Sequence, residues 1–309
     1  SGAVALALLT GLVVAVVLVA PWLLARPVWT VAVSGLVLVV VLVRPPVAGW
    51  PPPDWVMVAC DVGQGDALVL RAGPGSAVVV DAGPDPGAVD RCLTRLGVRA
   101  VPLLVLTHFH ADHVDGLAGV LSDRAVGEVN VSPLAAPEAS AAAASRVFAR
   151  AGLTPVLAPH LRLRRVGEVT LRQVWPPPGW VTASGAGEAA VNDASVVLLA
   201  QVRGLDILLM GDLEPTGQGH LAALLGDLRV DVLKVAHHGS RYQDQRLLAS
   251  LAPRLAVLSV GAENTYGHPS ADLLGDLRAL GARVLRTDVD GDVAVLGEGA
   301  GRLGIATQR

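Results

Sequence analysis

A polar cluster directly behind an apolar run is the feature of this sequence that most constrains its fold. Residues 103–106 (LLVL) predict a buried strand, because a short, continuous apolar run is typical of a strand covered on both faces. Four side chains able to bind a metal follow: His108, His110, Asp112 and His113. Imidazole nitrogens and a carboxylate oxygen suit divalent ions, and a strand end can hold them in place. The sequence therefore predicts a metal site at the end of a buried strand; a polar loop that merely contains histidines is the alternative.

Apolar periodicity after residue 55 predicts one large α/β domain. Three short strands separated by Gly-rich turns, at residues 56–60, 67–71 and 77–81, are typical of a β-meander. Helices are expected near residues 87–96, 115–121, 135–151, 214–225, 243–251 and 271–280, with strands near 169–174, 195–202, 205–210, 230–236 and 254–260. Two such mixed halves suit an αββα sandwich, in which helices cover two packed sheets.

The polar cluster and four further segments resemble a known family. Residues 108–113 (HFHADH) are similar to the HxHxDH motif of the metallo-β-lactamase superfamily. The remaining segments resemble, in the same order, parts of the C-terminal domain of the ComEC family, the inner-membrane DNA channel of natural transformation; they are residues 61–66, 209–212, 233–240 and 264–269. The likeness runs from about Trp55 to the C-terminus. It implies a metallo-β-lactamase-like sandwich over residues 55–309 with two divalent metal ions.

The N-terminal part has a different composition. The chain is 52% hydrophobic and 17% charged, against a usual charged share of about a quarter. Residues 1–25 carry no charge, and after Arg26 residues 27–43 carry none either, which predicts two transmembrane helices paired as a hairpin over residues 1–44. A cleaved signal peptide and a long buried hairpin are the alternatives. Residues 45–54 contain five prolines and predict an extended linker.

Specific ligands follow from the resemblance. It implies that His108 and His110 hold the first ion and Asp112 and His113 the second, and that Asp212, behind the apolar strand at 205–210, bridges the two. We favour His268 as the last ligand and His237 as a ligand or general acid, so that Asp112 and His237 are the candidate catalytic residues. Each of these histidines could instead be a core or surface residue, and His238 is the weakest candidate.

One position departs from the superfamily pattern. A further histidine ligand is expected between His113 and Asp212, but the only histidine there is His160, in an Arg-rich stretch. Asn192, before the strand at 195–202, occupies the expected position, and the resemblance implies that it is a ligand. An amide oxygen in place of an imidazole nitrogen favours Mn²⁺ or Mg²⁺ over Zn²⁺. We therefore expect two divalent ions, Mn²⁺ or Zn²⁺, with Mg²⁺ as a further candidate.

Other polar residues have candidate supporting roles. Family resemblance puts Asp61, Gln64 and Asp66 beside the metals, where they would orient imidazole ligands; a plain hairpin connection is the alternative. Lys234, the chain's only lysine, could contact a phosphate or extend its stem along the sheet. Net charge is −3, so DNA would need a local basic patch. Such a patch is predicted near Trp175 and Trp180, and a charged strand edge is the alternative reading; its residues are Arg162, Arg164 and Arg165.

Cys60 and Cys92 are the only cysteines, and each falls in an apolar element. We expect two small buried hydrophobic side chains rather than a disulfide or a ligand pair.

Together these features favour a metal-dependent phosphodiester hydrolase of a membrane DNA-uptake channel, which degrades or handles the strand that is not imported. The expected partners are DNA, the membrane and other parts of the uptake machinery. The single charge of the loop between the spans, Arg26, favours a cytoplasmic loop in a bacterial cell membrane, which leaves the domain on the extracytoplasmic side. One alternative is a catalytically weak module that guides DNA. The other is a hydrolase of small esters or thioesters, which would need no membrane span and would normally keep the full histidine set.

Overall fold

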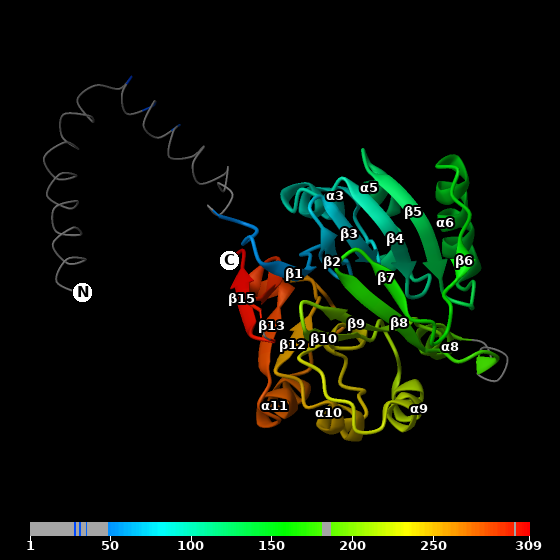
Figure 1. The fold of residues 1–309 in the computed structure, drawn as a ribbon, viewed down its shortest axis with the longest axis vertical. Coiled ribbons are helices and arrows are strands. Elements are labelled where there is room, and N and C mark those ends of the chain that lie inside the picture. Colours follow the sequence, from blue (N-terminus) through cyan, green and yellow to red (C-terminus); the bar gives the residue numbers. More distant parts are fainter. Residues whose placement is uncertain (1–27, 29–30, 32–34, 36–48, 181–186, 300) are drawn as a thin grey trace, which may run out of the picture. The chain divides into compact units, whose positions relative to one another are not determined.

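The computed structural model describes residues 28, 31, 35, 49–180, 187–299 and 301–309 (Figure 1). The chain divides into two compact units, Ser1–Gly49 and Trp50–Arg309. The predicted membrane spans lie outside the described residues, apart from the three isolated positions. Within the described residues we find no helix with the length and apolar character needed to cross a membrane.

Two sheets form the centre of the second unit. The first has the strand order β15-β14-β1-β2-β3-β4-β5-β6, and the second has the order β13-β12-β11-β10-β9-β8-β7. Consecutive antiparallel pairing of β1, β2 and β3 confirms the predicted meander. The strands of the first sheet are β1 (Trp55–Ala59), β2 (Leu68–Gly73), β3 (Ser76–Val80), β4 (Ala100–Leu106), β5 (Ala125–Val131), β6 (Val156–Leu157), β14 (Val293–Gly297) and β15 (Leu303–Thr307). Those of the second are β7 (Arg164–Val166), β8 (Val169–Trp175), β9 (Val197–Val202), β10 (Leu205–Leu209), β11 (Val232–Lys234), β12 (Leu255–Leu258) and β13 (Arg283–Arg286).

Helices cover the outer faces of both sheets (Figure 1). The first sheet packs against α3 (Pro86–Arg95), α5 (Leu117–Leu121) and α6 (Glu138–Arg150), and the second against α9 (Pro215–Leu225), α10 (Gln245–Leu251) and α11 (Ala271–Ala279). The shorter elements are α4 (Ala111–Val114), α8 (Glu188–Asp193), the 3₁₀ turn η1 (His237–Gly239) and α12 (Thr287–Asp290). The predicted αββα sandwich is therefore confirmed.

The side chains of each strand point alternately to the two faces of its sheet, and this explains the four layers of helices and sheets. In β4, Leu104 and Leu106 point into the core beneath α3 and α5, whereas Leu103 and Val105 point into the core between the sheets. A strand that is apolar on both faces must be covered on both faces, so each sheet needs helices on one side and its partner sheet on the other.

The layers bring the ends of many strands to one edge. Strands β3, β4 and β5 run parallel, as do β10, β11 and β12, so the residues after their carboxyl ends meet at the same side of their sheets. Loops at the carboxyl ends of parallel strands are the usual place for ligands in α/β proteins. The polar cluster after β4 lies on such an edge.

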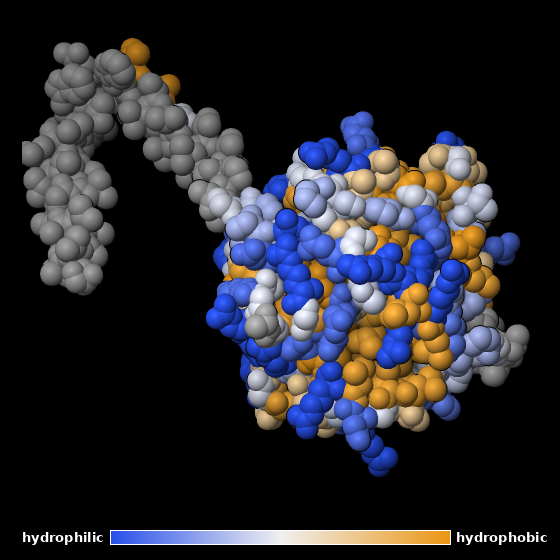
Figure 2. All heavy atoms as spheres, in the orientation of Figure 1, coloured by the Kyte–Doolittle hydropathy of each residue, from blue (hydrophilic) through white to orange (hydrophobic). Residues whose placement is uncertain are grey.

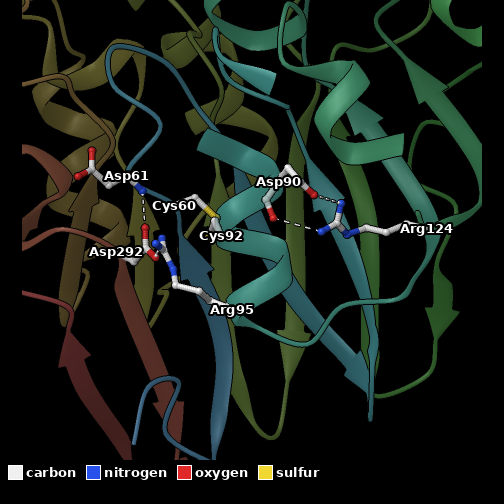
Figure 3. Close-up of a disulfide and its surroundings, with 7 residues drawn as sticks. All are labelled: Cys60, Asp61, Asp90, Cys92, Arg95, Arg124 and Asp292. Atoms are coloured by element: carbon white, nitrogen blue, oxygen red, sulfur yellow. Dashed lines mark hydrogen bonds and ion pairs between the residues drawn. A yellow bond between two sulfur atoms is a disulfide. The ribbon is translucent and has the colours of Figure 1, made fainter. Parts of the chain in front are cut away.

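The two cysteines form a disulfide, so the expectation of two free thiols was wrong. The Cys60–Cys92 bond joins the end of β1 to α3, and both residues are fully buried (Figure 3). Beside it, Arg95 of α3 reaches the buried carboxylate of Asp292 at 2.6 Å. Both cysteines are indeed buried among apolar side chains, but their elements pack directly against each other and bring the two sulfur atoms together.

Candidate metal centre

The metal-motif residues lie in short turns that follow the strands. His110 precedes α4, which carries Asp112 and His113, while Asp212 follows β10. His237 and His238 form the turn after β11, with φ angles of 49° and 52°. Non-glycine residues seldom adopt this left-handed conformation, and such positions gather at functional sites.

Four side chains from three segments form one close group: Asp112, His113, Asp212 and His238. The Nε2 atom of His238 lies 3.1 Å from Asp112 Oδ2 and 3.4 Å from Asp212 Oδ2. His113 Nε2 lies 3.3 Å from Asp212 Oδ1. His113, Asp212 and His238 are buried. The geometry thus brings His238 into the group, where we had favoured His268.

Hydrogen bonds on the far side of each imidazole fix its orientation. His113 Nδ1 lies 2.9 Å from the buried carboxylate of Asp81, and His238 Nδ1 lies 3.0 Å from the Ser259 carbonyl oxygen. In the neutral form of each ring, a proton on Nδ1 leaves Nε2 with its lone pair facing the group. This arrangement, in which an outer acceptor orients an imidazole, is the one that metal-binding histidines use.

The charges of the group favour a cation. Burial opposes a proton on His113 and His238, yet the surrounding carboxylates, with Asp212 the strongest, raise the pKa of both imidazoles well above its usual value. Burial likewise opposes ionisation of Asp212, but His238 and His113 hold its pKa well below the ordinary range. The pocket of carboxylates therefore attracts positive charge, which a divalent ion would also supply.

The first part of the motif forms a second set of ligand atoms. His108 Nε2 lies 3.0 Å from His110 Nδ1, so two ring nitrogens face the same point. On its other side, His108 Nδ1 lies 3.0 Å from the Thr107 hydroxyl, which donates to Asp81. Burial and the neighbouring His113 hold the pKa of His108 well below its usual value, and the neutral imidazole is the form that binds metals.

Helix α8 borders this set. Its first residue, Glu188, has Oε2 at 3.1 Å from His110 Nε2. Asn192, near its end, donates from Nδ2 to Glu214 Oε1 at 3.0 Å, while its buried Oδ1 accepts no hydrogen bond from the described residues. The Asn192 amide oxygen is therefore not engaged by the described residues, and its role as a ligand stays a prediction.

His237 and His268 lie beside the four-residue group. His237 Nδ1 is 3.0 Å from Glu214 Oε1, and its Nε2 is 3.9 Å from Asp212 Oδ2. The His268 ring packs edge-on against that of His237, with 5.3 Å between ring centroids. Burial, together with His237 and His238, lowers the pKa of His268 to about 4. His268 thus packs against His237 and lies outside the four-residue group, although its buried Nδ1 also makes no hydrogen bond with the described residues.

Most of the residues predicted to support the site have other partners than expected. Lys234 is fully buried and pairs with the buried Asp66 at 2.7 Å, so it does not reach a phosphate on the surface. Asp66 also lies 3.5 Å from His238 Nδ1, close to the orienting role predicted for it. Asp61 pairs with Arg309, and Gln64 accepts a hydrogen bond from Gly261; neither of these contacts is with an imidazole.

The predicted basic patch has less free charge than its sequence indicates. Arg164 pairs with Glu128 at 2.6 Å and Arg165 donates to the Gly167 carbonyl, while the Trp175 ring is buried and donates to the Asp193 carbonyl. Hydrophobic side chains gather over this part of the surface, near β7 and β8 (Figure 2). Trp175 is therefore not available at the surface beside the predicted patch, whereas Arg162 is exposed.

Three residues of the site were missed. Asp81 directly follows the apolar strand β3, and Asp212 likewise follows β10 after a short turn; this shared pattern was the available signal. The sequence does not single out His238, because two adjacent histidines give no indication of which one faces inward. Glu214 has no motif of its own; only the structure shows that it links Asn192 to His237.

The donor set fits divalent metal ions. His113 Nε2 and Asp212 Oδ1 are buried and face each other, yet neither makes a hydrogen bond within the described part of the chain. Buried polar atoms without partners are costly unless something else satisfies them. Imidazole nitrogens, carboxylates and one amide oxygen are ligands for zinc, manganese or iron, and this mixed set does not select one metal.

Comparison with known proteins agrees with this geometry. The sequence model of the metallo-β-lactamase superfamily matches residues 60–261, and the chain belongs to this superfamily. The ComEC resemblance is confirmed by curated relatives. The chain is 26% identical over 202 residues to ComE operon protein 3 of Bacillus subtilis (strain 168), covering 65% of this chain and 25% of the relative. It is 29% identical over 272 residues to competence protein ComA of Neisseria gonorrhoeae, covering 84% of this chain and 34% of the relative.

The chain spans about a quarter to a third of the length of the curated relatives it matches. Among solved structures, it is similar to CmlA, a diiron β-hydroxylase from Streptomyces venezuelae. The TM-score is 0.50 at 18% identity, with 76% of this chain and 53% of CmlA covered. At this level of identity the likeness concerns the fold alone.

Proposed function

We propose that residues 50–309 form a metal-dependent phosphodiesterase that acts on DNA in a membrane uptake channel. The observation that carries this proposal is the group of Asp112, His113, Asp212 and His238, in which the buried His113 Nε2 and Asp212 Oδ1 atoms face each other without hydrogen-bond partners among the described residues. The similarity to competence proteins supports DNA as the substrate. The membrane context likewise comes from the ComEC family and from the apolar residues 1–43.

Two sets of residues would hold the ions. His108, His110 and Asn192 would hold one, and Asp112, His113 and His238 the other, with Asp212 between them. Ions held there would supply Lewis acidity toward a phosphate oxygen and would activate water as the nucleophile.

His237 is suited to protonate the leaving oxygen. Burial opposes a proton on its ring, but Glu214 and Asp212 raise its pKa above the usual value. Its side chain is 27% exposed, so a substrate can reach it, whereas His238 is 2% exposed. Glu214 holds the Nδ1 side of the ring and leaves Nε2 directed toward Asp212. His237 would therefore act as the general acid and Glu214 as the residue that positions it.

The disulfide supports an extracytoplasmic location. Disulfides form and persist in oxidising compartments and are rare in the cytosol. The Cys60–Cys92 bond, within the same unit as the metal-binding group, agrees with the topology that Arg26 favours. Protection of this unit from protease added to intact spheroplasts would contradict the proposed location.

The test uses the full chain, purified with detergent present, and labelled single- and double-stranded DNA. With Mn²⁺ we expect cleavage that EDTA abolishes and that Asp212→Ala removes. If the wild-type chain binds DNA but leaves it intact with Mn²⁺, Zn²⁺ and Mg²⁺, the phosphodiesterase proposal fails and a DNA-guiding module takes its place.

A further inference from the structure

A cavity of about 470 Å³ lies between two loops, residues 61–64 and residues 261–266, with Asp288 and Arg309 also on its wall. This volume falls within the range of about 300–1,000 Å³ that is usual for small-ligand sites. The cavity takes no part in the chemistry proposed above. Three features of the cavity indicate what it could bind: its connection to the metal-binding group, the ring of Tyr266 on its wall, and the charge of its lining.

The first loop connects the cavity to Asp112. Gln64 accepts a hydrogen bond from the Gly261 amide at 3.1 Å, and a side chain at Gly261 would bring its Cβ within 2.5 Å of the Gln64 nitrogen. The two loops therefore meet only because residue 261 is glycine. Two residues beyond Gln64, the Asp66 amide donates to the Asp112 carbonyl at 3.2 Å.

The second loop connects the cavity to the proposed general acid through three rings. Tyr266 stacks on His268 with 6.0 Å between ring centroids and 29° between planes, and His268 packs edge-on against His237. Tyr266 is nevertheless 72% exposed, so much of its ring remains open. Asn264 fixes the loop, because it donates to the Gly261 and His268 carbonyls, each at 2.8 Å.

The charge of the cavity argues against a phosphate there. Asp61, Glu263 and Asp288 line it, with one guanidinium, that of Arg309, which pairs with Asp61 at 2.7 Å. Asp288 pairs with Arg286, so Glu263 is the carboxylate of the lining that has no ion pair among the described residues. A second phosphate would meet net negative charge. The exocyclic amino groups of a base, in contrast, donate hydrogen bonds that carboxylates accept, and its flat face stacks on an aromatic ring.

We propose that this cavity is a base subsite, in which one nucleobase of the DNA strand stacks on Tyr266 while its backbone passes the metal centre. The proposal rests on the proposed function and adds how the strand is held. Because carboxylates accept but do not donate hydrogen bonds, bases with an amino group should bind best: adenine, cytosine and guanine before thymine.

The test measures binding without metal, so that it does not depend on cleavage. The full chain, in detergent with EDTA, is titrated with a pentanucleotide whose central residue alone carries a base, the fluorescent 2-aminopurine. The comparator is the same pentamer without any base, measured by competition. We expect the base to tighten binding by about tenfold and its fluorescence to be quenched, in the range of one aromatic stacking contact.

Variants assign the effect to Tyr266. Tyr266→Ala should remove both the quenching and the tenfold preference, while Tyr266→Phe should keep them. Tyr242→Ala is the matched control, because Tyr242 is the only other tyrosine, is also exposed and does not line the cavity. Equal binding of the two pentamers, or an unchanged preference in Tyr266→Ala, would overturn the base subsite. Failure of the metal-dependent cleavage assay alone would instead reject the phosphodiesterase proposal.

Discussion

Two buried clusters of charge in the same unit are built in opposite ways. We define the disulfide cluster as Cys60, Cys92, Arg95 and Asp292 (Figure 3). In it, the Asp292 carboxylate accepts a hydrogen bond from the Asp61 backbone amide at 2.8 Å and pairs with the Arg95 guanidinium at 2.6 Å. In the metal-binding group, Asp212 Oδ1 faces an imidazole nitrogen at 3.3 Å without hydrogen-bond geometry. Paired charge holds elements together, whereas buried atoms left without partners point to a missing ligand.

The largest contrast should come from removing one carboxylate in each cluster. Asp212→Ala should lower metal-dependent cleavage at least about 1000-fold, as expected for a residue of the reacting centre, while the protein stays folded. Asp292→Ala should cost about 2 kcal/mol of unfolding free energy, because it leaves Arg95 without its buried partner, and should keep activity per folded molecule. Cleavage rates and urea unfolding measure the two effects. The comparison breaks down if Asp292→Ala abolishes activity in folded protein or Asp212→Ala leaves it intact.

The disulfide cluster should dominate stability. Replacing both Cys60 and Cys92 by Ala opens a loop with a sequence separation of 32 residues, and should lower the free energy of unfolding by about 3 kcal/mol. Metal content should not change. Reductant should destabilise the wild-type chain similarly and leave the double variant unaffected, which controls for effects of the substitutions themselves. A double variant as stable as the oxidised wild type would contradict this role.

His238 and His268, the two candidates for the last metal ligand, should differ in how much their loss weakens metal binding. His238→Ala should weaken metal binding by about 100-fold, since even the loss of an outer partner costs 10- to 100-fold. His268→Ala should change metal affinity by less than about threefold, because its ring packs on His237 and it lies outside the four-residue group. Elemental analysis after dialysis reports both. The reverse pattern would restore His268 as the ligand.

The sequence predicts the layers of the fold and much of the site, because the patterns that define them lie between residues close together in the chain. Apolar runs such as residues 103–106 and the strand-end motif residues are adjacent in the chain, so pattern alone places them. The Cys60–Cys92 bond depends on where α3 packs against β1, which no spacing encodes. The choice of His238 over His268 depends on a left-handed turn at His237 and His238. Trp175 is buried because its strand is covered by α9, a tertiary contact.

A smaller effect should sharpen the role of Asn192. If its free Oδ1 is a ligand, Asn192→His should raise zinc retention by about tenfold and shift activation from Mn²⁺ toward Zn²⁺, because imidazole nitrogen suits zinc better than an amide oxygen does. Asp193→His should have this effect only if the register is one residue off. Unchanged metal content in both variants would remove Asn192 from the site.

The smallest effect concerns pH and Asp193, next to the site. Burial raises the pKa of this carboxyl to about 6, above its ordinary value of 3.8. Folding therefore favours the protonated form. The contribution of the Asp193 carboxyl to the free energy of unfolding is fully present below about pH 4 and is lost as the pH rises through 6. Asparagine can still accept from the Glu214 and Gly217 amides. Asp193→Asn should thus gain about 1 kcal/mol at pH 7.5 and nothing at pH 4, as thermal unfolding at the two values would show. An equal change at both pH values would exclude ionisation as the cause.

The central claim is that the unpaired buried atoms are metal ligands. The most direct measurement is the number of Mn²⁺ ions bound per chain at equilibrium dialysis, by elemental analysis, for the wild-type chain and for Asp212→Ala. We predict two ions per wild-type chain and the loss of at least one in the variant, with circular dichroism unchanged. A wild-type chain that retains no ion, or a folded Asp212→Ala variant that retains as many as the wild type, would contradict the claim.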